Sequence, residues 1–238
     1  MKTPHLHHPS AVEPRHEHAD NGHGDNAAPE DGTTVVAART QPFLQRFSGV
    51  ITSSERTQVL GQKSMTVWLT GLSGAGKSTL AFELERQLMS ERRACYVLDG
   101  DSVRHGLTSD LGFSAEDRRE NIRRVAHVAQ LMNDAGLIVI VALISPMRED
   151  RAMAREIIGQ DKFIEVYVAA SVTDCERRDP KGLYAKARSG AIPSFTGVSA
   201  PYEPPTDPDL TVDTAALSKA GSVARVFGYL QDRYLSMP

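Results

Sequence analysis

Residues 66–79 have the sequence Thr-Val-Trp-Leu-Thr-Gly-Leu-Ser-Gly-Ala-Gly-Lys-Ser-Thr, an apolar stretch that runs into a glycine-rich loop. The loop fills the pattern G-x-x-x-x-G-K-[ST] with Gly71, Gly76, Lys77 and Ser78. Glycines at these positions let successive backbone N–H groups turn toward a polyphosphate. The lysine adds a positive charge for the outer phosphates, and the serine hydroxyl is suited to bind Mg²⁺. The loop therefore predicts a site for a nucleoside triphosphate.

The residues on either side of the loop strengthen the match. Residues 67–69 are strand formers, while Leu80, Ala81, Leu84 and Leu88 follow at the spacing of an apolar helix face. A strand before the loop and a helix after it aim the helix N-terminus at the bound anion. The alternative, a glycine-rich turn that precedes Lys-Ser by chance, explains neither flank. We expect the whole loop to contact the nucleotide, namely Gly71, Leu72, Ser73, Gly74, Ala75, Gly76, Lys77, Ser78 and Thr79.

The composition limits the class of protein. The chain has 238 residues, of which 40% are hydrophobic and 24% charged, as in a soluble protein with one sizeable domain and a tail. A net charge of −3 argues against a general nucleic-acid or anionic-membrane binder. The two cysteines, Cys95 and Cys175, share no metal-ligand spacing and indicate a reducing compartment. No signal-peptide pattern opens the chain, and the longest apolar run, 137–144, is too short to span a bilayer. We therefore expect a cytoplasmic enzyme.

Residues 1–42 differ in composition from the rest of the chain. They are rich in His, Pro, Asp, Glu, Gly and Ala and poor in large apolar side chains, so we expect a disordered His-rich tail followed by a folded domain over 43–238. Six histidines occur in the tail, at positions 5, 7, 8, 16, 18 and 23. They are compatible with metal binding, but their spacing matches no defined site, and we favour a merely solvated tail. We assign the tail no role.

In the domain, apolar strand patterns alternate with helical patterns. Capping signals at Thr52–Glu55 and at Ser114–Asp117 mark two helix starts, and 223–230 has the spacing of a last helix. Near-continuous apolar strands separated by helices predict an α/β fold of three layers, with a five-stranded, mainly parallel sheet covered on both faces. The predicted strands are 66–70, 94–98, 137–143, 163–168 and 210–212.

The segment from about 177 to 208 interrupts this alternation. It is basic at first, then rich in Gly, Pro and Ser, with little apolar periodicity. Long irregular segments inside compact domains are usually lids or binding loops, so we expect a lid here. The alternative is a passive surface loop.

A pair of carboxylates follows the second predicted strand. Ligands bind open α/β sheets at the carboxyl ends of the strands, and the strand 94–98 runs directly into Asp99-Gly100-Asp101. We expect the first two strands to end side by side, which would place both carboxylates at the phosphate loop for metal contact and proton acceptance. An Asp-Gly turn after a strand is the structural alternative. The chain lacks the Asn-Lys-x-Asp sequence that reads guanine, which argues against a signalling GTPase and favours a small-molecule kinase.

Several segments, taken in order, match one family. From about Thr52 to Val212 the chain resembles adenylylsulfate kinase, also called adenosine 5′-phosphosulfate (APS) kinase. The matching segments are Gly-Leu-Ser-Gly-Ala-Gly-Lys-Ser-Thr at 71–79, Leu-Asp-Gly-Asp-Ser-Val-Arg-His-Gly-Leu at 98–107, Asp-Leu-Gly-Phe-Ser at 110–114, Asp-Arg-Arg-Glu-Asn-Ile-Arg-Arg at 117–124, Ile-Ser-Pro at 144–146, Arg-Asp-Pro-Lys-Gly-Leu-Tyr at 178–184 and Phe-Thr-Gly-Val at 195–198.

The resemblance implies a P-loop kinase fold and an acceptor site. The family transfers the γ-phosphoryl group of MgATP to the ribose 3′-hydroxyl of APS. By similarity, Phe113 and Phe195 sandwich the adenine of APS. The resemblance assigns the phosphosulfate and ribose to Arg104, Arg118 and Asn121, the assisting backbone to Ile144 and Ser145, and a further cation to Lys181 of the lid. Taken singly, the phenylalanines fit a core and the arginines fit a solvated helix face.

The phosphate loop and the carboxylate pair indicate the catalytic roles. With APS as the acceptor, we expect Asp101 nearest the attacking 3′-oxygen, Asp99 and Ser78 at Mg²⁺, and Lys77 to offset charge on the transferred group.

Two further assignments concern the lid and Ser145. Arg177 and Arg178 are expected as lid cations or contacts to the adenine of ATP. Bacterial members are described with a phosphorylated serine at the position of Ser145, which makes that residue a candidate phosphoserine, although direct in-line transfer requires no covalent intermediate.

The resemblance leaves partners and alternatives to be tested. Ser102 stands where many relatives have Asn, which puts one minor polar contact in doubt. Relatives commonly form homodimers, and an ATP sulfurylase partner is expected to be a separate chain. Two other functions are a kinase for another acceptor, such as a nucleoside monophosphate or sugar acid, and a nucleotide-binding subunit without catalysis.

Overall fold

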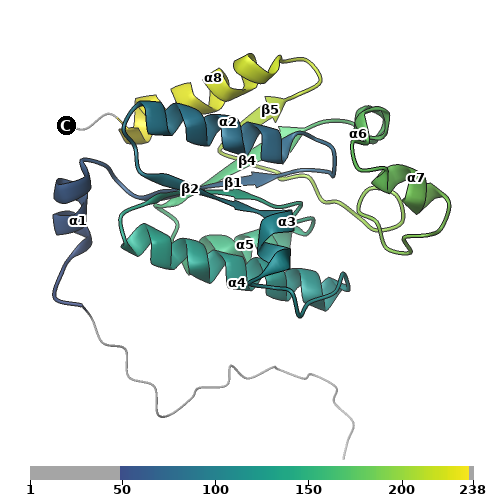
Figure 1. The fold of residues 1–238 in the computed structure, drawn as a ribbon, viewed down its shortest axis with the longest axis horizontal. Coiled ribbons are helices and arrows are strands. Elements are labelled where there is room, and N and C mark those ends of the chain that lie inside the picture. Colours follow the sequence, from purple (N-terminus) through teal and green to yellow (C-terminus); the bar gives the residue numbers. More distant parts are fainter. Residues whose placement is uncertain (1–48, 236–238) are drawn as a thin grey trace, which may run out of the picture. The chain divides into compact units, whose positions relative to one another are not determined.

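The computed structural model describes residues 49–235, so the predicted tail over 1–42 and the predicted start of folded structure at 43 lie outside the described residues. Figure 1 shows the arrangement of the elements. The strands are β1 (Met65–Thr70), β2 (Cys95–Asp99), β3 (Ile138–Ala142), β4 (Phe163–Ala169) and β5 (Leu210–Asp213). The helices are α1 (Ser53–Leu60), α2 (Lys77–Ser90), α3 (Gly100–His105), α4 (Ala115–Asp134), α5 (Arg148–Ile158), α6 (Val172–Arg178), α7 (Leu183–Arg188) and α8 (Lys219–Leu230), followed by a π-helical turn over Gln231–Leu235.

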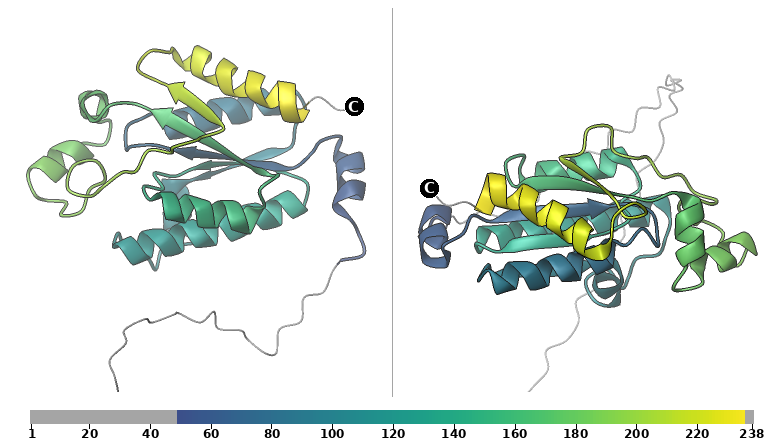
Figure 2. Two further views of the ribbon diagram at one scale, coloured as in Figure 1. Left: turned by 180° about the vertical axis from the view of Figure 1, so that it is seen from behind. Right: turned by 90° about the horizontal axis from the view of Figure 1, so that it is seen from above.

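The five strands form one sheet in the order β2-β3-β1-β4-β5, and each pairing between them is parallel. The prediction of a mainly parallel sheet is therefore confirmed, and the sheet is in fact wholly parallel. Each predicted strand is present, with ends that differ by one residue or so. The sheet is the middle of three layers, with α2 and α8 on one face and α4 and α5 on the other (Figures 1 and 2).

Alternate residues of β1 supply the two halves of the core. Val67 and Leu69 are fully buried with the apolar residues of α2 and α8, whereas Trp68 packs on the other face with Val125 of α4 and Phe163 of β4. Burial on both faces explains why the central strands are apolar at nearly every position. None of the helices within residues 49–235 is long and apolar enough to cross a membrane.

The predicted helix starts are confirmed at both capping signals. The Thr52 hydroxyl accepts from the Glu55 N–H at 3.2 Å, and the Glu55 carboxylate accepts in return from the Thr52 N–H at 2.7 Å. The Ser114 hydroxyl accepts from the Asp117 N–H at 3.0 Å at the start of α4. Each side chain satisfies a backbone donor that the first turn of a helix leaves unpaired.

One expectation about the sheet is wrong. Strands β1 and β2 are not neighbours, because β3 lies between them, with Ala142 aligned with both Leu69 and Asp99. The reason is burial. All five residues of β3 are buried, which suits an interior strand, whereas Tyr96 of β2 is 55% exposed, which suits an edge strand. The ends of β1 and β2 are nevertheless level, because both align with the same residue of β3.

The predicted lid segment, 177–208, combines helix and irregular chain. It contains the end of α6, all of α7 and a short bridge between Thr196 and Ala200. Tyr184 and Phe195 are buried and pack edge to face, with ring centroids 4.9 Å apart. Figure 1 shows α6 and α7 at the end of the sheet opposite α1, beyond the carboxyl ends of the strands. That this segment moves as a lid stays a prediction.

Asn133 links α4 to β1 through buried hydrogen bonds. Its Oδ1 accepts from the Thr66 hydroxyl at 2.8 Å, and its Nδ2 donates to the carbonyls of Met65 and Leu137 at 2.9 and 3.1 Å. Asn133→Leu keeps the branched shape of the side chain but leaves these groups without partners, so we expect the free energy of unfolding to fall by about 2–4 kcal/mol. Chemical denaturation measures this change.

The adjacent residue provides a control. Asp134 is 61% exposed and lies 3.6 Å from Lys162 in a surface ion pair. Asp134→Leu should change the free energy of unfolding by no more than about 0.5 kcal/mol. Equal effects of the two substitutions would contradict the structural role of the Asn133 network.

Candidate active site

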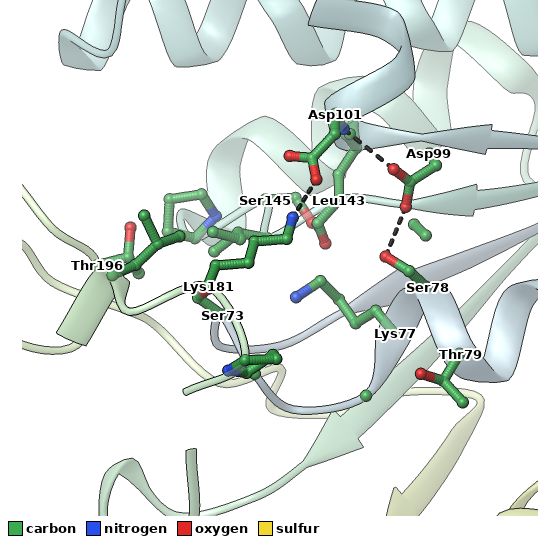
Figure 3. Close-up of a pocket in the computed structure, with 18 of the residues that line it drawn as sticks. Ser73, Lys77, Ser78, Thr79, Asp99, Asp101, Leu143, Ser145, Lys181 and Thr196 are labelled. Carbon is green, nitrogen blue, oxygen red and sulfur yellow. Dashed lines mark hydrogen bonds and ion pairs between the residues drawn. The ribbon is translucent and has the colours of Figure 1, made fainter. Parts of the chain in front are cut away.

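A cavity of about 1500 Å³ lies at the carboxyl ends of the strands (Figure 3). Its walls come from segments far apart in the sequence: the phosphate loop and the start of α2, the end of β2 with α3, the end of β3, the lid segment, and the start of α8. The sheet topology brings these segments together, because parallel strands present all their carboxyl ends at one edge.

The phosphate loop forms the floor of this cavity. Ser73, Gly74, Gly76, Lys77, Ser78 and Thr79 line it. Gly71, Leu72 and Ala75 are buried and do not line the cavity. Gly71 has a φ of +154°, and a Cβ at this position would lie 2.5 Å from the carbonyl oxygen of Val168. Only glycine therefore lets the loop pass this close to β4.

Lys77 is buried and folded over its own loop. Its Nζ donates to the carbonyls of Gly71 and Leu72 at 2.9 and 2.8 Å. Burial lowers the pKa of Lys77 to about 8, because the charged ammonium loses hydration inside the protein. Lys77 is the first residue of α2, so its charge lies beside the positive end of that helix. This end of the cavity is prepared for an anion.

Asp99 connects the end of β2 to the phosphate loop. The Ser78 hydroxyl donates to Asp99 Oδ2 at 2.5 Å, and Asp99 Oδ1 accepts from the Asp101 N–H at 3.1 Å as the N-cap of α3. The predicted convergence of the carboxylate pair on the loop is therefore present, although β3 separates the two strands. Asp99 is 7% exposed, whereas the side chain of Asp101 is 67% exposed and reaches across the cavity.

Asp101 forms an ion pair with Lys181, which comes from the lid segment on the opposite wall (Figure 3). Both side chains line the cavity. The pair joins the lid to α3 across the opening. A substrate with its own anionic group would compete for Lys181 and release the Asp101 carboxylate.

The oxygen atoms at Ser78 and Asp99 fit Mg²⁺. A hydroxyl and a carboxylate are hard oxygen donors, and Mg²⁺ is usually held by one or two carboxylates together with substrate phosphates rather than by a full protein cage. Within residues 49–235 no three His, Cys, Asp or Glu side chains gather into such a cage. The donor set is that of an ion that arrives with a nucleotide.

A second part of the cavity is cationic and aromatic. The Arg104 guanidinium stacks over the Phe113 ring at 4.3 Å and donates to the Gly112 carbonyl at 2.9 Å. Arg118 donates to the Phe113 carbonyl, the Thr196 hydroxyl and the Ser194 carbonyl at 2.6–2.9 Å. Burial lowers the pKa of both arginines, and for Arg104 the charge of Arg118 adds to the effect. Two desolvated guanidinium groups side by side favour an anionic ligand.

The two predicted adenine contacts lie on the same cavity in different environments. Phe113 is 64% exposed, whereas Phe195 is 8% exposed and covered on one side by Tyr184. Asn121 also lines the cavity, and its Oδ1 accepts from the buried Thr108 hydroxyl at 2.7 Å. That the two rings enclose an adenine stays a prediction.

Ser145 has an unusual backbone conformation at the end of β3. Its φ is +40°, a left-handed value that non-glycine residues rarely adopt, and the residue is 3% exposed. Its hydroxyl accepts from the indole N–H of Trp68 at 3.1 Å and lies 3.5 Å from the carbonyl of Leu143. Neither partner is a base that could activate a nucleophile. The neighbouring Ile144 carbonyl accepts from the Thr70 hydroxyl at 2.8 Å.

The two arginines at the start of the lid segment differ in position. Arg178 lines the cavity and donates to the hydroxyl and carbonyl of Thr214 at 3.0 and 2.8 Å. Arg177 does not line the cavity; its side chain is 76% exposed and pairs with Asp174.

Thr214 is a site residue that sequence reasoning missed. Its hydroxyl donates to the Ala75 carbonyl of the phosphate loop at 2.8 Å, and it lines the cavity beside Arg178. It directly follows β5, the fifth strand of the sheet. The strand-end argument that singled out Asp99 would have found Thr214 as well, had it been applied to this short strand.

Comparison with known proteins agrees with the geometry. The family model described as Adenylylsulphate kinase matches residues 63–213. The adenylyl-sulfate kinase of Staphylococcus epidermidis is 52% identical over 182 residues, which cover 76% of this chain and 92% of the relative. That of Shewanella amazonensis is 55% identical over 180 residues, covering 76% and 91%.

Solved structures give the same result. The APS kinase CysC of Mycobacterium tuberculosis, in complex with AMPPNP and APS, has a TM-score of 0.69 and 49% identity to this chain, covering 71% of this chain and 99% of that one. The family model spans more than half of the chain, and the relatives match over most of their own length. This chain belongs to the adenylylsulfate kinase family.

Proposed function

We propose that this enzyme transfers the γ-phosphoryl group of ATP to the ribose 3′-hydroxyl of APS, giving 3′-phosphoadenosine 5′-phosphosulfate. The observation that carries the proposal is the division of one cavity into two parts. A phosphate loop with Lys77 and the Ser78–Asp99 contact lies at one part, and a cationic, aromatic wall with Arg104, Arg118 and Phe113 lies at the other. The similar Mycobacterium tuberculosis structure holds an ATP analogue and APS together.

The loop would hold the donor nucleotide. Backbone N–H groups of the loop and the positive end of α2 would face the β- and γ-phosphates, and Lys77 would exchange the loop carbonyls for phosphate oxygens. Arg178, at the end of α6, and Thr214, directly after β5, line the cavity beside the loop and would contact the rest of the nucleotide. Arg177 has no such position.

Ser78 and Asp99 would hold Mg²⁺ against the phosphates. The ion supplies positive charge that neutralises the donor's phosphate oxygens. Asp99 needs no movement to serve, because its carboxylate is already fixed by the Ser78 hydroxyl and the Asp101 N–H. Such a fixed group costs no reorganisation during the reaction.

Asp101 would orient the acceptor 3′-hydroxyl and accept its proton late in a loose transition state. In the structure its carboxylate is paired with Lys181. The phosphosulfate of APS would bind Arg104 and Arg118 and would also attract Lys181 away from Asp101. The adenine would lie against Phe113 and Phe195. Substrate binding would thereby free the base at the moment when it is needed.

The proposal favours direct transfer over a phosphoserine at Ser145. The Ser145 hydroxyl is buried and held by Trp68, with no base as partner. A rapid-quench search for phosphoserine that passes its phosphate to APS tests this point. Detection of such a species would restore Ser145 as a covalent intermediate.

We place the enzyme in the cytoplasm, a reducing compartment in which the free thiols of Cys95 and Cys175 would stay reduced. A homodimer and a separate ATP sulfurylase partner stay predictions.

The acceptor assay tests the function directly. Purified protein with MgATP and APS should release ADP and the 3′-phosphorylated product, because one cavity offers sites for both substrates. Nucleoside monophosphates and sugar acids serve as competing acceptors, and preference for one of them would change the substrate. Tight ATP binding without turnover of any acceptor would indicate a non-catalytic nucleotide-binding subunit.

Asp101→Asn should reduce kcat by about 10²–10⁴-fold, because the amide keeps the size of the side chain but accepts no proton. The affinity for ATP, measured by calorimetry, should change little, since Asp101 lies on the acceptor side. Asp110 is a suitable control, because it is an exposed carboxylate that pairs with Arg124 at 2.7 Å and does not line the cavity. Asp110→Asn should keep nearly full activity. Equal losses of turnover and ATP affinity in Asp101→Asn would mean that its role is misassigned.

The lowered pKa of Lys77, about 8, predicts a pH dependence of ATP binding. Above this pH the free enzyme loses the Lys77 proton, and ATP must restore it, so the affinity at pH 9 should be about tenfold lower than at pH 7. Above pH 8 the folded chain has lost the Lys77 proton, while the unfolded chain still holds it. The contribution of Lys77 to the free energy of unfolding therefore becomes more favourable as pH rises from 7 to 9. Calorimetry from pH 7 to 9 measures the affinity.

Lys77→Arg is the matched control, because a guanidinium stays charged throughout this range. Its ATP affinity should be independent of pH. The same decline in Lys77→Arg as in the wild type would assign the titration to another group.

A further inference from the structure

We propose that Arg151, which lies behind the cavity, is a positioning residue for the acceptor site. It would hold the loop 143–146 in its active conformation and tie that loop to the end of the lid segment. The inference rests on the proposed function and extends it to a residue that does not line the cavity.

Arg151 is fully engaged by three elements. It lies on α5, is 3% exposed, and donates from Nη1 to the Ser145 carbonyl at 2.7 Å, from Nη2 to the Glu203 carbonyl at 2.9 Å and from Nε to Glu165 Oε1 at 2.6 Å. Glu165 belongs to β4 and is itself 12% exposed. Each of the three guanidinium nitrogens therefore donates to a different residue, an arrangement that the single ammonium of lysine does not reproduce.

The loop needs such support. Ser145 has a left-handed φ of +40°, which a non-glycine residue keeps only when surrounding contacts impose it. The Ser145 carbonyl accepts from Arg151 and lies 3.3 Å from the Thr70 hydroxyl, while the Ser145 hydroxyl accepts from Trp68. Leu143, Ile144, Ser145 and Pro146 all line the cavity, so their backbone conformation sets the shape of its acceptor side.

The same guanidinium reaches the lid segment. The Glu203 N–H donates to the Pro146 carbonyl at 2.9 Å, and the Glu203 carboxylate accepts from the Arg148 N–H at 2.8 Å. Together with the Arg151 contact to its carbonyl, these bonds fix residue 203 to the loop and to the start of α5. One buried cation thus joins the acceptor loop to the point where the lid segment returns to the sheet.

Arg155 offers a matched control on the same helix. It lies one turn after Arg151, pairs with Asp209 at 3.0 Å, lies 3.8 Å from Glu165, and stacks on Phe163 at 4.7 Å. Its described partners include no residue of the loop 143–146. Removal of Arg155 therefore perturbs the same ionic cluster without releasing the loop.

The test compares Arg151→Met, Arg151→Lys and Arg155→Met in the full chain. For Arg151→Met we expect the KM for APS to rise by about tenfold or more, because small displacements of positioning groups weaken binding strongly, while the Kd for ATP stays within about twofold. Arg151→Lys keeps the buried charge opposite Glu165 and should raise the KM for APS by a smaller factor. It also serves if Arg151→Met does not fold. Arg155→Met should leave the KM for APS unchanged.

Trp68 gives a second readout that needs no turnover. It is the single tryptophan of the chain, and its indole contacts Ser145, so its fluorescence emission should change in both Arg151 variants and not in Arg155→Met. An unchanged KM for APS in the Arg151 variants, equal losses of ATP and APS affinity, or the same effects in Arg155→Met would each overturn the inference. Absence of APS turnover in the wild type would refute the proposed function instead, and the fluorescence comparison would still test the loop.

Discussion

The hydrogen bond between Ser78 and Asp99, at 2.5 Å, joins the phosphate loop to the end of β2. Ser78 belongs to the phosphate loop that follows a central strand, and Asp99 belongs to the end of the edge strand β2. β3 separates these strands, so the contact forms only because the strands end at the same level. The parallel sheet therefore brings the two side chains together, and the capping of α3 by Asp99 fixes the carboxylate that accepts this hydrogen bond.

Around this contact, charge is arranged in advance of any ligand. Lys77, Arg104 and Arg118 are all partly or fully desolvated, and burial lowers the pKa of each. In the described structure their donors are occupied by backbone carbonyls and hydroxyls, which are weaker acceptors than phosphate or sulfate oxygens. Under the proposed function, phosphate and sulfate oxygens of the substrates would replace these weaker acceptors, and the stronger hydrogen bonds would contribute to the free energy of binding.

Much of this arrangement was predictable from the sequence. The phosphate loop, the strand before it and the Asp99-Gly100-Asp101 turn are local patterns, because each depends on residues close together in the chain. The position of β3 was not, since strand order depends on which apolar strand is buried from both sides. Thr214 could have been found from its place after the fifth strand, but the contacts of Arg151 could not, because two of its three partners are backbone carbonyls of distant segments, and a carbonyl leaves no mark on the residue type.

The exposure of Phe113 has a thermodynamic consequence. Its ring is 64% exposed, with Arg104 stacked on one face, so in the free enzyme an aromatic surface stays hydrated on the wall of the cavity. Any purine that covers this ring releases the water around it, and removal of apolar surface from water lowers the heat capacity of the complex. With APS bound against Phe113, as proposed, binding should therefore grow more exothermic with temperature, beyond what the ionic contacts alone produce.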